Sequence, residues 1–199
     1  MPLLIGLTGG IATGKSTVAK MFLDINIPVI DTDQISKELL KKGSEAYFEI
    51  LDMCGQDVLL TNKDLNRKKL AKVIFEDKDK RKKLNRIVHP KVMNITLSEI
   101  KRYTILDAKI IVIDVPLLFE TDFIDLVDKI ITVYAKKDLQ LERLIMRDKI
   151  SESYALKKIE SQMLLDDKVM KSDFVIDNSS SILSTKKQFN EIVKIIEVK

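Results

Sequence analysis

The sequence has little of what extracellular, membrane and zinc proteins require. Its single cysteine, Cys54, excludes an internal disulfide, and its one histidine leaves no short-spaced Cys/His cluster for structural zinc. Apolar runs are short: the longest tract, 110–119, is interrupted by Asp114, and the N-terminal run has only a few residues. We therefore expect neither a signal peptide nor a membrane span, and a soluble protein of a reducing, cytoplasmic compartment.

A strong charge excess is also missing. The 34 basic and 30 acidic residues give a net charge of +4, which is weak for a nucleic-acid-binding protein. A basic cluster around Arg81 and Arg86 could attract a pyrophosphate, or could form a solvated helix face. We expect no nucleic-acid or membrane partner, whereas anionic small molecules remain compatible. The 45% hydrophobic content is ample for the core of one domain.

A glycine-rich turn follows the first apolar run, residues 3–8, and precedes a helical pattern. Gly9, four further residues and then Gly14-Lys15-Ser16 match the spacing of a phosphate-binding loop between a strand and a helix. Lys15 would reach the β- and γ-phosphates, and the Ser16 hydroxyl would bind magnesium directly. An ordinary glycine-rich turn is the alternative, but the flanking strand and helix favour phosphate binding. The predicted contacts are Gly9, Gly10, Ile11, Ala12, Thr13, Gly14, Lys15, Ser16 and Thr17.

The remaining pattern predicts an α/β fold with a five-stranded parallel sheet flanked by helices. Further β-like runs lie at 27–30, 109–114, 128–134 and 173–177, and helical patterns at 137–148, 151–168 and 184–198. Strands that alternate with helices indicate a parallel sheet. Residues 34–101 are mostly helical, with a boundary at Pro90. Because no Pro/Gly/Ser-rich linker marks either edge, we expect a helical insertion and not an independent domain.

Three aspartates are predicted to lie at strand ends. Asp31 and Asp33 follow the second strand at the ligand-binding edge of the sheet, where one could hold metal-bound water while the other accepts a hydroxyl proton. Asp33 could instead cap a helix that begins at Gln34. Asp114, at the end of the third strand, could hold magnesium through water or be a turn residue before Pro116.

Two arginines and the histidine are further candidates. Arg143 and Arg147 are four residues apart in a predicted helix, so they share a face and could clamp phosphate oxygens. Alternatively they form local surface pairs with partners such as Glu142 and Asp148. His89 lies in a basic helical segment, and a single histidine is more often structural than catalytic.

Six blocks together resemble the dephospho-coenzyme A kinase family over nearly the whole chain. They are 7–17, 29–33, 84–90, 114–120, 143–148 and 175–178. The resemblance implies a P-loop NTPase-type sheet, ATP and Mg²⁺, and direct in-line transfer to the ribose 3′-hydroxyl of dephospho-coenzyme A. It also implies a single domain, 1–199, with a core of about 1–33, 105–136 and 169–199, an acceptor-binding insertion of about 34–104 and a mobile lid of about 137–168. We expect a monomer or weak homo-oligomer.

The family's functional residues carry over by motif. The catalytic base falls on Asp33, the lid arginines on Arg143 and Arg147, the acceptor-side residues on Arg81, His89 and Leu117, and the adenine-side loop on Asp177 and Asn178. Two departures are Lys158, where many relatives have arginine, and Asp167, where glutamate is usual. A lysine cannot reproduce the planar guanidinium fork, so that lid contact is in doubt.

Two other functions remain open from the sequence. A small kinase of the same architecture could phosphorylate a nucleoside monophosphate. A nucleotide-dependent switch without transfer activity is less compatible, because a guanine-reading motif is missing.

Overall fold

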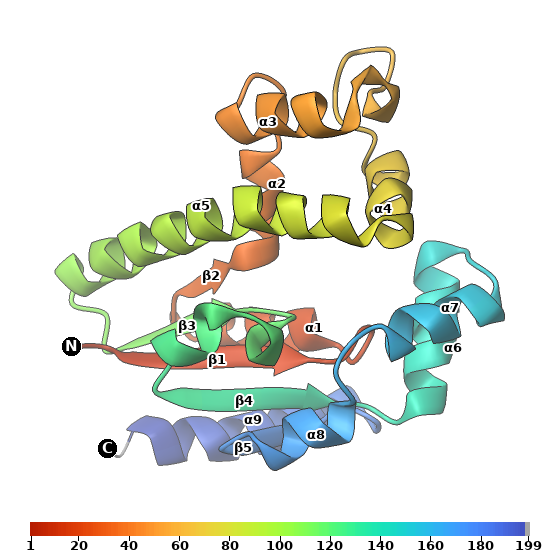
Figure 1. Ribbon diagram of the computed structural model, residues 1–199. Coiled ribbons are helices and arrows are strands. Elements are labelled where there is room, and N and C mark those ends of the chain that lie inside the picture. Colours follow the sequence, from red (N-terminus) through yellow and green to blue (C-terminus); the bar gives the residue numbers. More distant parts are fainter. Residues whose placement is uncertain (198–199) are drawn as a thin grey trace. The chain divides into compact units, whose positions relative to one another are not determined.

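The computed structural model describes residues 1–197, with the side chains of residues 75, 76, 78 and 197 excepted (Figure 1). The chain divides into two compact units. We call Met1–Asp31 together with Arg102–Lys199 the sheet unit, and Thr32–Lys101 the helical unit. The helical unit occupies the stretch for which the sequence predicts a helical insertion.

The sheet unit is built on five parallel strands. They are β1 (Leu3–Gly9), β2 (Val29–Asp31), β3 (Ile110–Asp114), β4 (Lys129–Tyr134) and β5 (Phe174–Asp177), in the order β2-β3-β1-β4-β5. The predicted five-stranded parallel sheet is therefore confirmed. The register pairs Asp31 with Asp114, so the last residues of β2 and β3 are direct neighbours.

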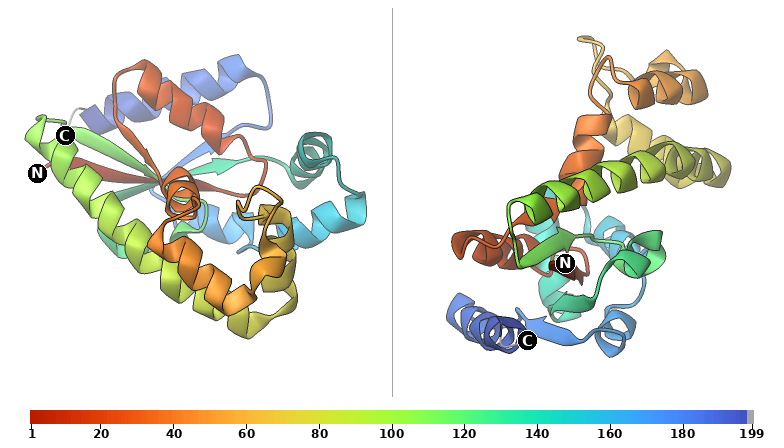
Figure 2. Two further views of the ribbon diagram at one scale, coloured as in Figure 1. Left: turned by 90° about the horizontal axis from the view of Figure 1, so that it is seen from above. Right: turned by 90° about the vertical axis from the view of Figure 1, so that its left-hand side faces the viewer.

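The core lies where two helices cover one face of this sheet. Helices α1 (Lys15–Asp24) and α9 (Ile182–Glu197) pack there (Figure 2). Between them Phe22 and Phe189 meet edge to face, with ring centroids 4.7 Å apart. Such buried aromatic side chains each stabilise the fold by about 2–3 kcal/mol. On the other face, a Cβ on Gly6 would lie 2.8 Å from Leu118, which shows how closely the turn η2 (Leu118–Glu120) packs on β1.

The rest of the sheet unit follows the carboxyl ends of β3 and β4. It comprises η3 (Asp122–Leu126), α6 (Lys137–Asp148), α7 (Glu152–Glu160) and α8 (Leu165–Met170). The predicted single helix over 151–168 is wrong, because α7 ends at Glu160 and α8 begins at Leu165. The Ser161 hydroxyl donates to the Lys158 carbonyl at 2.8 Å and thus satisfies a terminal carbonyl of α7. The C-terminal helix was predicted to end at Val198, which lies outside the described residues.

The helical unit contains α2 (Thr32–Leu39), α3 (Glu45–Cys54), η1 (Gln56–Val58), α4 (Arg67–Glu76) and most of α5 (Lys78–Ile105). Two side chains cap helices here: Ser44 accepts from the Tyr47 N–H and Asn66 from the Lys69 N–H. The buried cluster of this unit includes Tyr47, Ile50 and Val58.

Helix α5 corrects a second prediction. It continues through Pro90, where the sequence predicted a boundary. The flanking Val88 and Val92 are buried, and their packing offsets the backbone hydrogen bond that proline removes. Although α5 has 28 residues, neither it nor any other helix in the described part of the chain combines the length and apolar character needed to cross a membrane.

Candidate active site

The predicted phosphate loop connects β1 to α1 and contains two residues with positive φ. Ala12 has a φ of +60° and Gly14 a φ of +92°. At Gly14 a Cβ would also overlap the amide nitrogen of Asn178, and at Gly9 it would lie 2.7 Å from the Val133 carbonyl oxygen. Both glycines are thus required by the conformation or packing of the loop.

Four backbone N–H groups of this loop have no acceptor among the residues that the structure describes. They belong to Ala12, Gly14, Lys15 and Ser16. The next N–H group, of Thr17, already bonds the Gly14 carbonyl at 2.9 Å and so closes the first turn of α1. Unpaired donors at the positive end of a helix dipole form an anion-binding site.

Lys15 and two aspartates lie at the neighbouring strand ends. The Lys15 Nζ forms an ion pair with Asp114, and their side chains are only 17% and 6% exposed. Asp31 adjoins Asp114 through the β2–β3 register. The structure thus brings together the phosphate-loop lysine and two predicted magnesium ligands, whereas Ser16 is exposed at the start of α1.

The two arginines of α6 have different surroundings. Arg143 donates from Nη2 to the Asn178 carbonyl at 3.1 Å, and its buried Nη1 has no hydrogen-bond partner in the described part of the chain. This Nη1 lies 4.0 Å from the position of a Cβ on Gly14, so it is beside the phosphate loop. A buried donor without a partner is costly, and a phosphate oxygen is the acceptor that this position suits.

Arg147 forms the local pair that the sequence left open. Its Nε donates to Asp148 at 2.8 Å, and Lys158 of α7 donates to the same carboxylate at 2.7 Å. These hydrogen bonds, that from Arg147 first, lower the pKa of Asp148 from 3.8 to about 2. Lys158 thus connects α7 to the end of α6.

Both polar atoms of the Asn178 side chain form hydrogen bonds within the protein. Its Nδ2 donates to the Thr13 carbonyl at 2.8 Å, and its Oδ1 accepts from the Thr185 hydroxyl at 2.9 Å. The side chain therefore fixes the phosphate loop against the start of α9. Asp177 is exposed, and its Oδ1 accepts from the Ser179 N–H at 2.8 Å.

The predicted acceptor-side residues are divided between the two units. Asp33 lies in the first turn of α2, which begins at Thr32 and not at Gln34 as the capping alternative requires. Arg81 and His89 are both exposed on α5, eight residues apart and close to one face. Leu117 belongs to the sheet unit and is 41% exposed.

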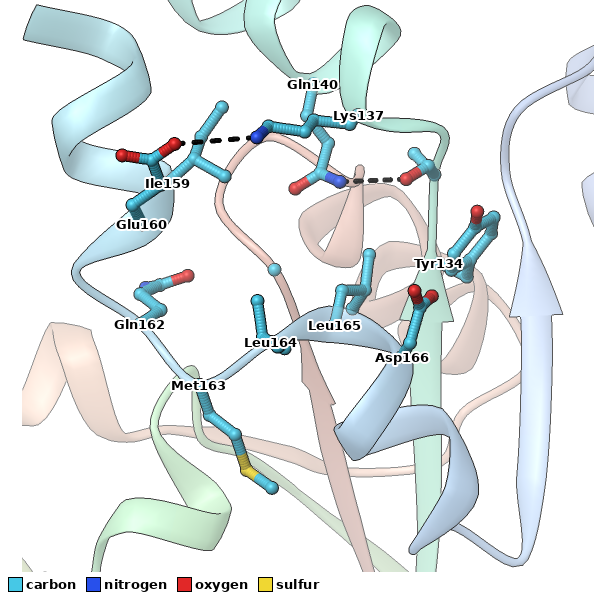
Figure 3. Close-up of a pocket in the computed structure, with 12 residues that line it drawn as sticks. Tyr134, Lys137, Gln140, Ile159, Glu160, Gln162, Met163, Leu164, Leu165 and Asp166 are labelled. Atoms are coloured by element: carbon cyan, nitrogen blue, oxygen red, sulfur yellow. Dashed lines mark hydrogen bonds and ion pairs between the residues drawn. The ribbon is translucent and has the colours of Figure 1, made fainter.

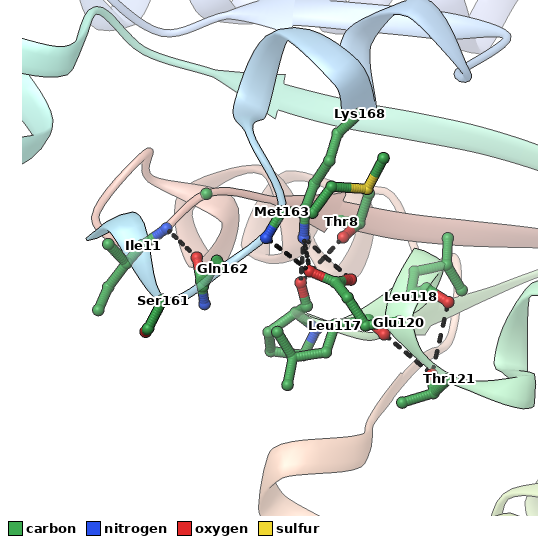
Figure 4. Close-up of polar contacts among 12 residues, drawn as sticks. Thr8, Ile11, Leu117, Leu118, Glu120, Thr121, Ser161, Gln162, Met163 and Lys168 are labelled. Atoms are coloured by element: carbon green, nitrogen blue, oxygen red, sulfur yellow. Dashed lines mark hydrogen bonds and ion pairs between the residues drawn. The ribbon is translucent and has the colours of Figure 1, made fainter. Parts of the chain in front are cut away.

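Sequence reasoning missed three residues that contact the loop or support the segment that does. Gln162 accepts from the Ile11 N–H at 3.0 Å, and the fully buried Lys168 pairs with Glu120 at 3.0 Å (Figure 4). Only tertiary folding creates these contacts, so spacing along the sequence carried no signal for their roles.

A small cavity of about 160 Å³ adjoins the loop at Gly10 (Figure 3). Its walls include Tyr134, Gln140, Ile159 and Leu165, and neither Lys15 nor Asp114 is among its lining residues. Gln140 donates to the Ala135 carbonyl at 2.8 Å, which fixes the start of α6 beside the cavity. The cavity is therefore separate from the charged groups of the phosphate site.

The donor set fits magnesium held mainly by phosphates and water. No group of three or more His, Cys, Asp or Glu side chains in the described part of the chain could hold a metal by itself. Ser16, Asp31 and Asp114 offer separate oxygen ligands, as Mg²⁺ uses when it binds with a nucleotide.

Comparison with known proteins decides the family. The sequence model of the dephospho-CoA kinase family matches residues 3–184. The chain belongs to the dephospho-CoA kinase family. A dephospho-CoA kinase of Oceanobacillus iheyensis is 45% identical over 194 residues, covering 98% of both chains.

Two solved structures resemble this dephospho-CoA kinase family member over nearly their full lengths. The crystal structure of a Thermus thermophilus protein matches with a TM-score of 0.83 and 26% identity, covering 97% of both chains. The dephospho-CoA kinase from Campylobacter jejuni matches with a TM-score of 0.72 and 27% identity, covering 98% of both chains. The chain is thus an enzyme of coenzyme A biosynthesis with a P-loop kinase fold.

Proposed function

We propose that the protein transfers the γ-phosphoryl group of ATP to the ribose 3′-hydroxyl of dephospho-coenzyme A in one in-line step. The observation that carries this proposal is the convergence of unpaired phosphate-loop N–H groups and the unpaired Arg143 Nη1 at the start of α1. Family membership supports the choice of acceptor. The protein would therefore bind a triphosphate on backbone donors and stabilise the charge that develops during transfer.

Each group at the nucleotide side has a proposed role. Residues 9–17 would bind the phosphates. The Lys15 ammonium would contact the γ-phosphoryl group during its transfer, and Arg143 would donate to the oxygens of that group. Ser16 would bind Mg²⁺ directly, with Asp31 and Asp114 binding its water ligands; the metal would neutralise phosphate charge. Asp177 and Asn178 would border the adenine through the backbone, since the Asn178 side chain already bonds Thr13 and Thr185.

The proposed acceptor site is argued from the helical unit and from the position of Asp33 in the sequence just after β2. Asp33 follows the end of β2 by two residues, and we propose that it accepts the proton of the 3′-hydroxyl. Arg81, His89 and Leu117 would bind the acceptor, and residues 34–104 would form its binding domain. Residues 137–168 would form the lid, in which Arg147, now paired with Asp148, would contact phosphate.

Product analysis tests this proposal directly. Dephospho-coenzyme A incubated with Mg·ATP should gain one phosphoryl group at the 3′ position, as determined by mass spectrometry with fragmentation. Asp33→Asn should lower the rate about a hundredfold or more while ATP still binds, because a positioned base is lost. Asp31→Asn makes the same change of charge two residues earlier and should instead raise the Mg²⁺ concentration that half-maximal activity requires.

The same assay with a panel of nucleoside monophosphates separates the rival kinase activity. A phosphorylated monophosphate and unmodified dephospho-coenzyme A would contradict the proposed acceptor. Near-normal turnover by Asp33→Asn would remove the assigned base.

A further inference from the structure

Residues 161–164, which we call the linker, join α7 to α8 and contact the phosphate loop. The Gln162 Oε1 accepts from the Ile11 N–H at 3.0 Å, across 151 positions of sequence (Figure 4). Two residues further along the loop, the Thr13 carbonyl accepts from the Asn178 amide at 2.8 Å. Side-chain amides from two distant segments therefore fix the loop on both sides of Ala12.

The linker is itself anchored to an ion pair between the buried Lys168 and Glu120, whose side chain is 28% exposed. The Met163 N–H donates to the Glu120 Oε1 at 3.2 Å, and Glu120 pairs with Lys168 at 3.0 Å (Figure 4). Lys168 is 0% exposed and also donates to the Pro116 carbonyl at 3.1 Å. A buried ammonium group holds its partners firmly, since losing one of them leaves an unpaired charge. The anchor thus fixes the residue next to Gln162.

The neutral amide suits this position. The Ile11 N–H needs an acceptor, which determines that the oxygen and not the nitrogen of Gln162 faces it. A carboxylate could accept the same hydrogen bond, but its negative charge would repel a nearby triphosphate. Hydrogen bonding and charge can therefore be separated by substitution.

We infer that Gln162 is a positioning residue that holds the phosphate loop in its ATP-binding shape, with Glu120 and Lys168 as its anchor. This inference rests on the proposed function only in taking ATP as the ligand of the loop. Because the linker between α7 and α8 contacts the loop, ATP affinity depends on a side chain far away in sequence.

Three single variants, one double variant and one control test the inference. Gln162→Met removes the acceptor at similar size, Gln162→Glu keeps the acceptor and adds charge, and Glu120→Gln weakens the anchor while retaining an acceptor for Met163. The control is Glu160→Gln, which removes an exposed ion pair with Lys137 at 3.5 Å, two residues before Gln162 at the end of α7. Calorimetric titration with Mg·ATP, without acceptor, gives Kd; steady-state assays give KM for each substrate, and thermal melts give Tm.

Gln162→Met should raise the Kd of ATP about fivefold, the net worth of one hydrogen bond, with KM for the acceptor unchanged. Gln162→Glu should weaken ATP binding further, by about tenfold or more, because of like charge. Glu120→Gln should also raise the Kd of ATP. The double variant Glu120→Gln/Gln162→Met should bind ATP no more weakly than Gln162→Met alone, because the anchor acts through Gln162. The control should bind ATP within about twofold of the wild type, as expected for an exposed pair.

An unchanged ATP Kd for Gln162→Met, with or without a lower Tm, would overturn the inference. If the wild type phosphorylates dephospho-coenzyme A in that case, the proposed function survives. If the variants shift the ATP Kd as expected but dephospho-coenzyme A gains no phosphoryl group, the inference stands and the proposed acceptor is wrong.

Discussion

Gly14 combines a local and a long-range constraint at one residue. Its φ of +92° is a conformation that L-residues rarely adopt, and the space in front of its missing Cβ is filled by the Asn178 amide. Gly43 has nearly the same φ, +89°, but nothing lies within 4 Å of the position of its Cβ. The chain therefore contains its own control for separating backbone strain from packing.

Gly14→Ala should reduce kcat/KM for ATP by about a hundredfold or more, since the Asn178 amide and the phosphate loop must move apart. Gly43→Ala should cost only the backbone strain, about 1–2 kcal/mol, and lower Tm by a few degrees with unchanged kinetics. Steady-state kinetics and thermal melts of both variants check this. Equal kinetics for the two variants would show that the contact with Asn178 does not matter.

The sequence could predict those site residues whose roles depend on close spacing. Gly9, Gly14, Lys15 and Ser16 lie close together in sequence between the end of β1 and the start of α1, so their pattern specifies the loop without help from the rest of the fold. Arg143 and Arg147 share a helix face by spacing, yet only Arg143 lies beside the loop. Helical periodicity gives the direction of a side chain and not what the fold places opposite it.

At the scale of elements, α6 and α7 are connected by charges that spacing alone did not reveal. Asp148 ends α6 and accepts from Arg147 and from Lys158 on α7. Contacts with distant residues also explain why two helix ends were predicted wrongly. The break at 161–164 depends on contacts of the linker with Glu120 and Ile11. Helix α5 continues through Pro90, with buried valines on both sides. Strands were predictable because their apolar runs are local.

The Asp148 cluster predicts a pH-dependent contribution to stability. Its pKa is lowered to about 2 in the folded protein from an ordinary value of 3.8, so the folded state binds the proton less readily. The stabilisation is complete above the unfolded value and is lost as the pH falls from 3.8 toward 2. Asp148→Asn should therefore lower Tm by about 2–4 °C at pH 6, and this difference should shrink by pH 3.

Melting curves of the wild type and Asp148→Asn across this pH range measure the difference directly, so that other titrating carboxylates cancel. Lys158→Met should reduce the gap, since it removes one of the two donors. A gap that is constant from pH 6 to pH 3 would contradict the role given to this ion pair.

At the scale of the whole molecule, the sequence could indicate a parallel sheet interrupted by a helical stretch, since local patterns of apolar residues predict both. It could not specify which distant groups meet. The Ile11–Gln162 and Thr13–Asn178 contacts join positions more than 150 residues apart and arise only when the sheet orders β1, β4 and β5 side by side. Neighbouring residues thus specify the phosphate loop, whereas residues distant in sequence hold it in place.

The division into two units predicts separate responses to the two substrates. In hydrogen-exchange mass spectrometry, Mg·ATP alone should slow exchange at 9–17 and along α6 in the sheet unit, because ligand binding stabilises the structure it contacts. Dephospho-coenzyme A alone should slow exchange around Arg81 and His89 on α5. At a ligand concentration of about 100 times Kd, residues that exchange by unfolding of the bound unit should slow about a hundredfold. Protection by dephospho-coenzyme A that is confined to the sheet unit would remove the helical unit from acceptor binding, because a ligand held by α5 must reduce the opening of that helix.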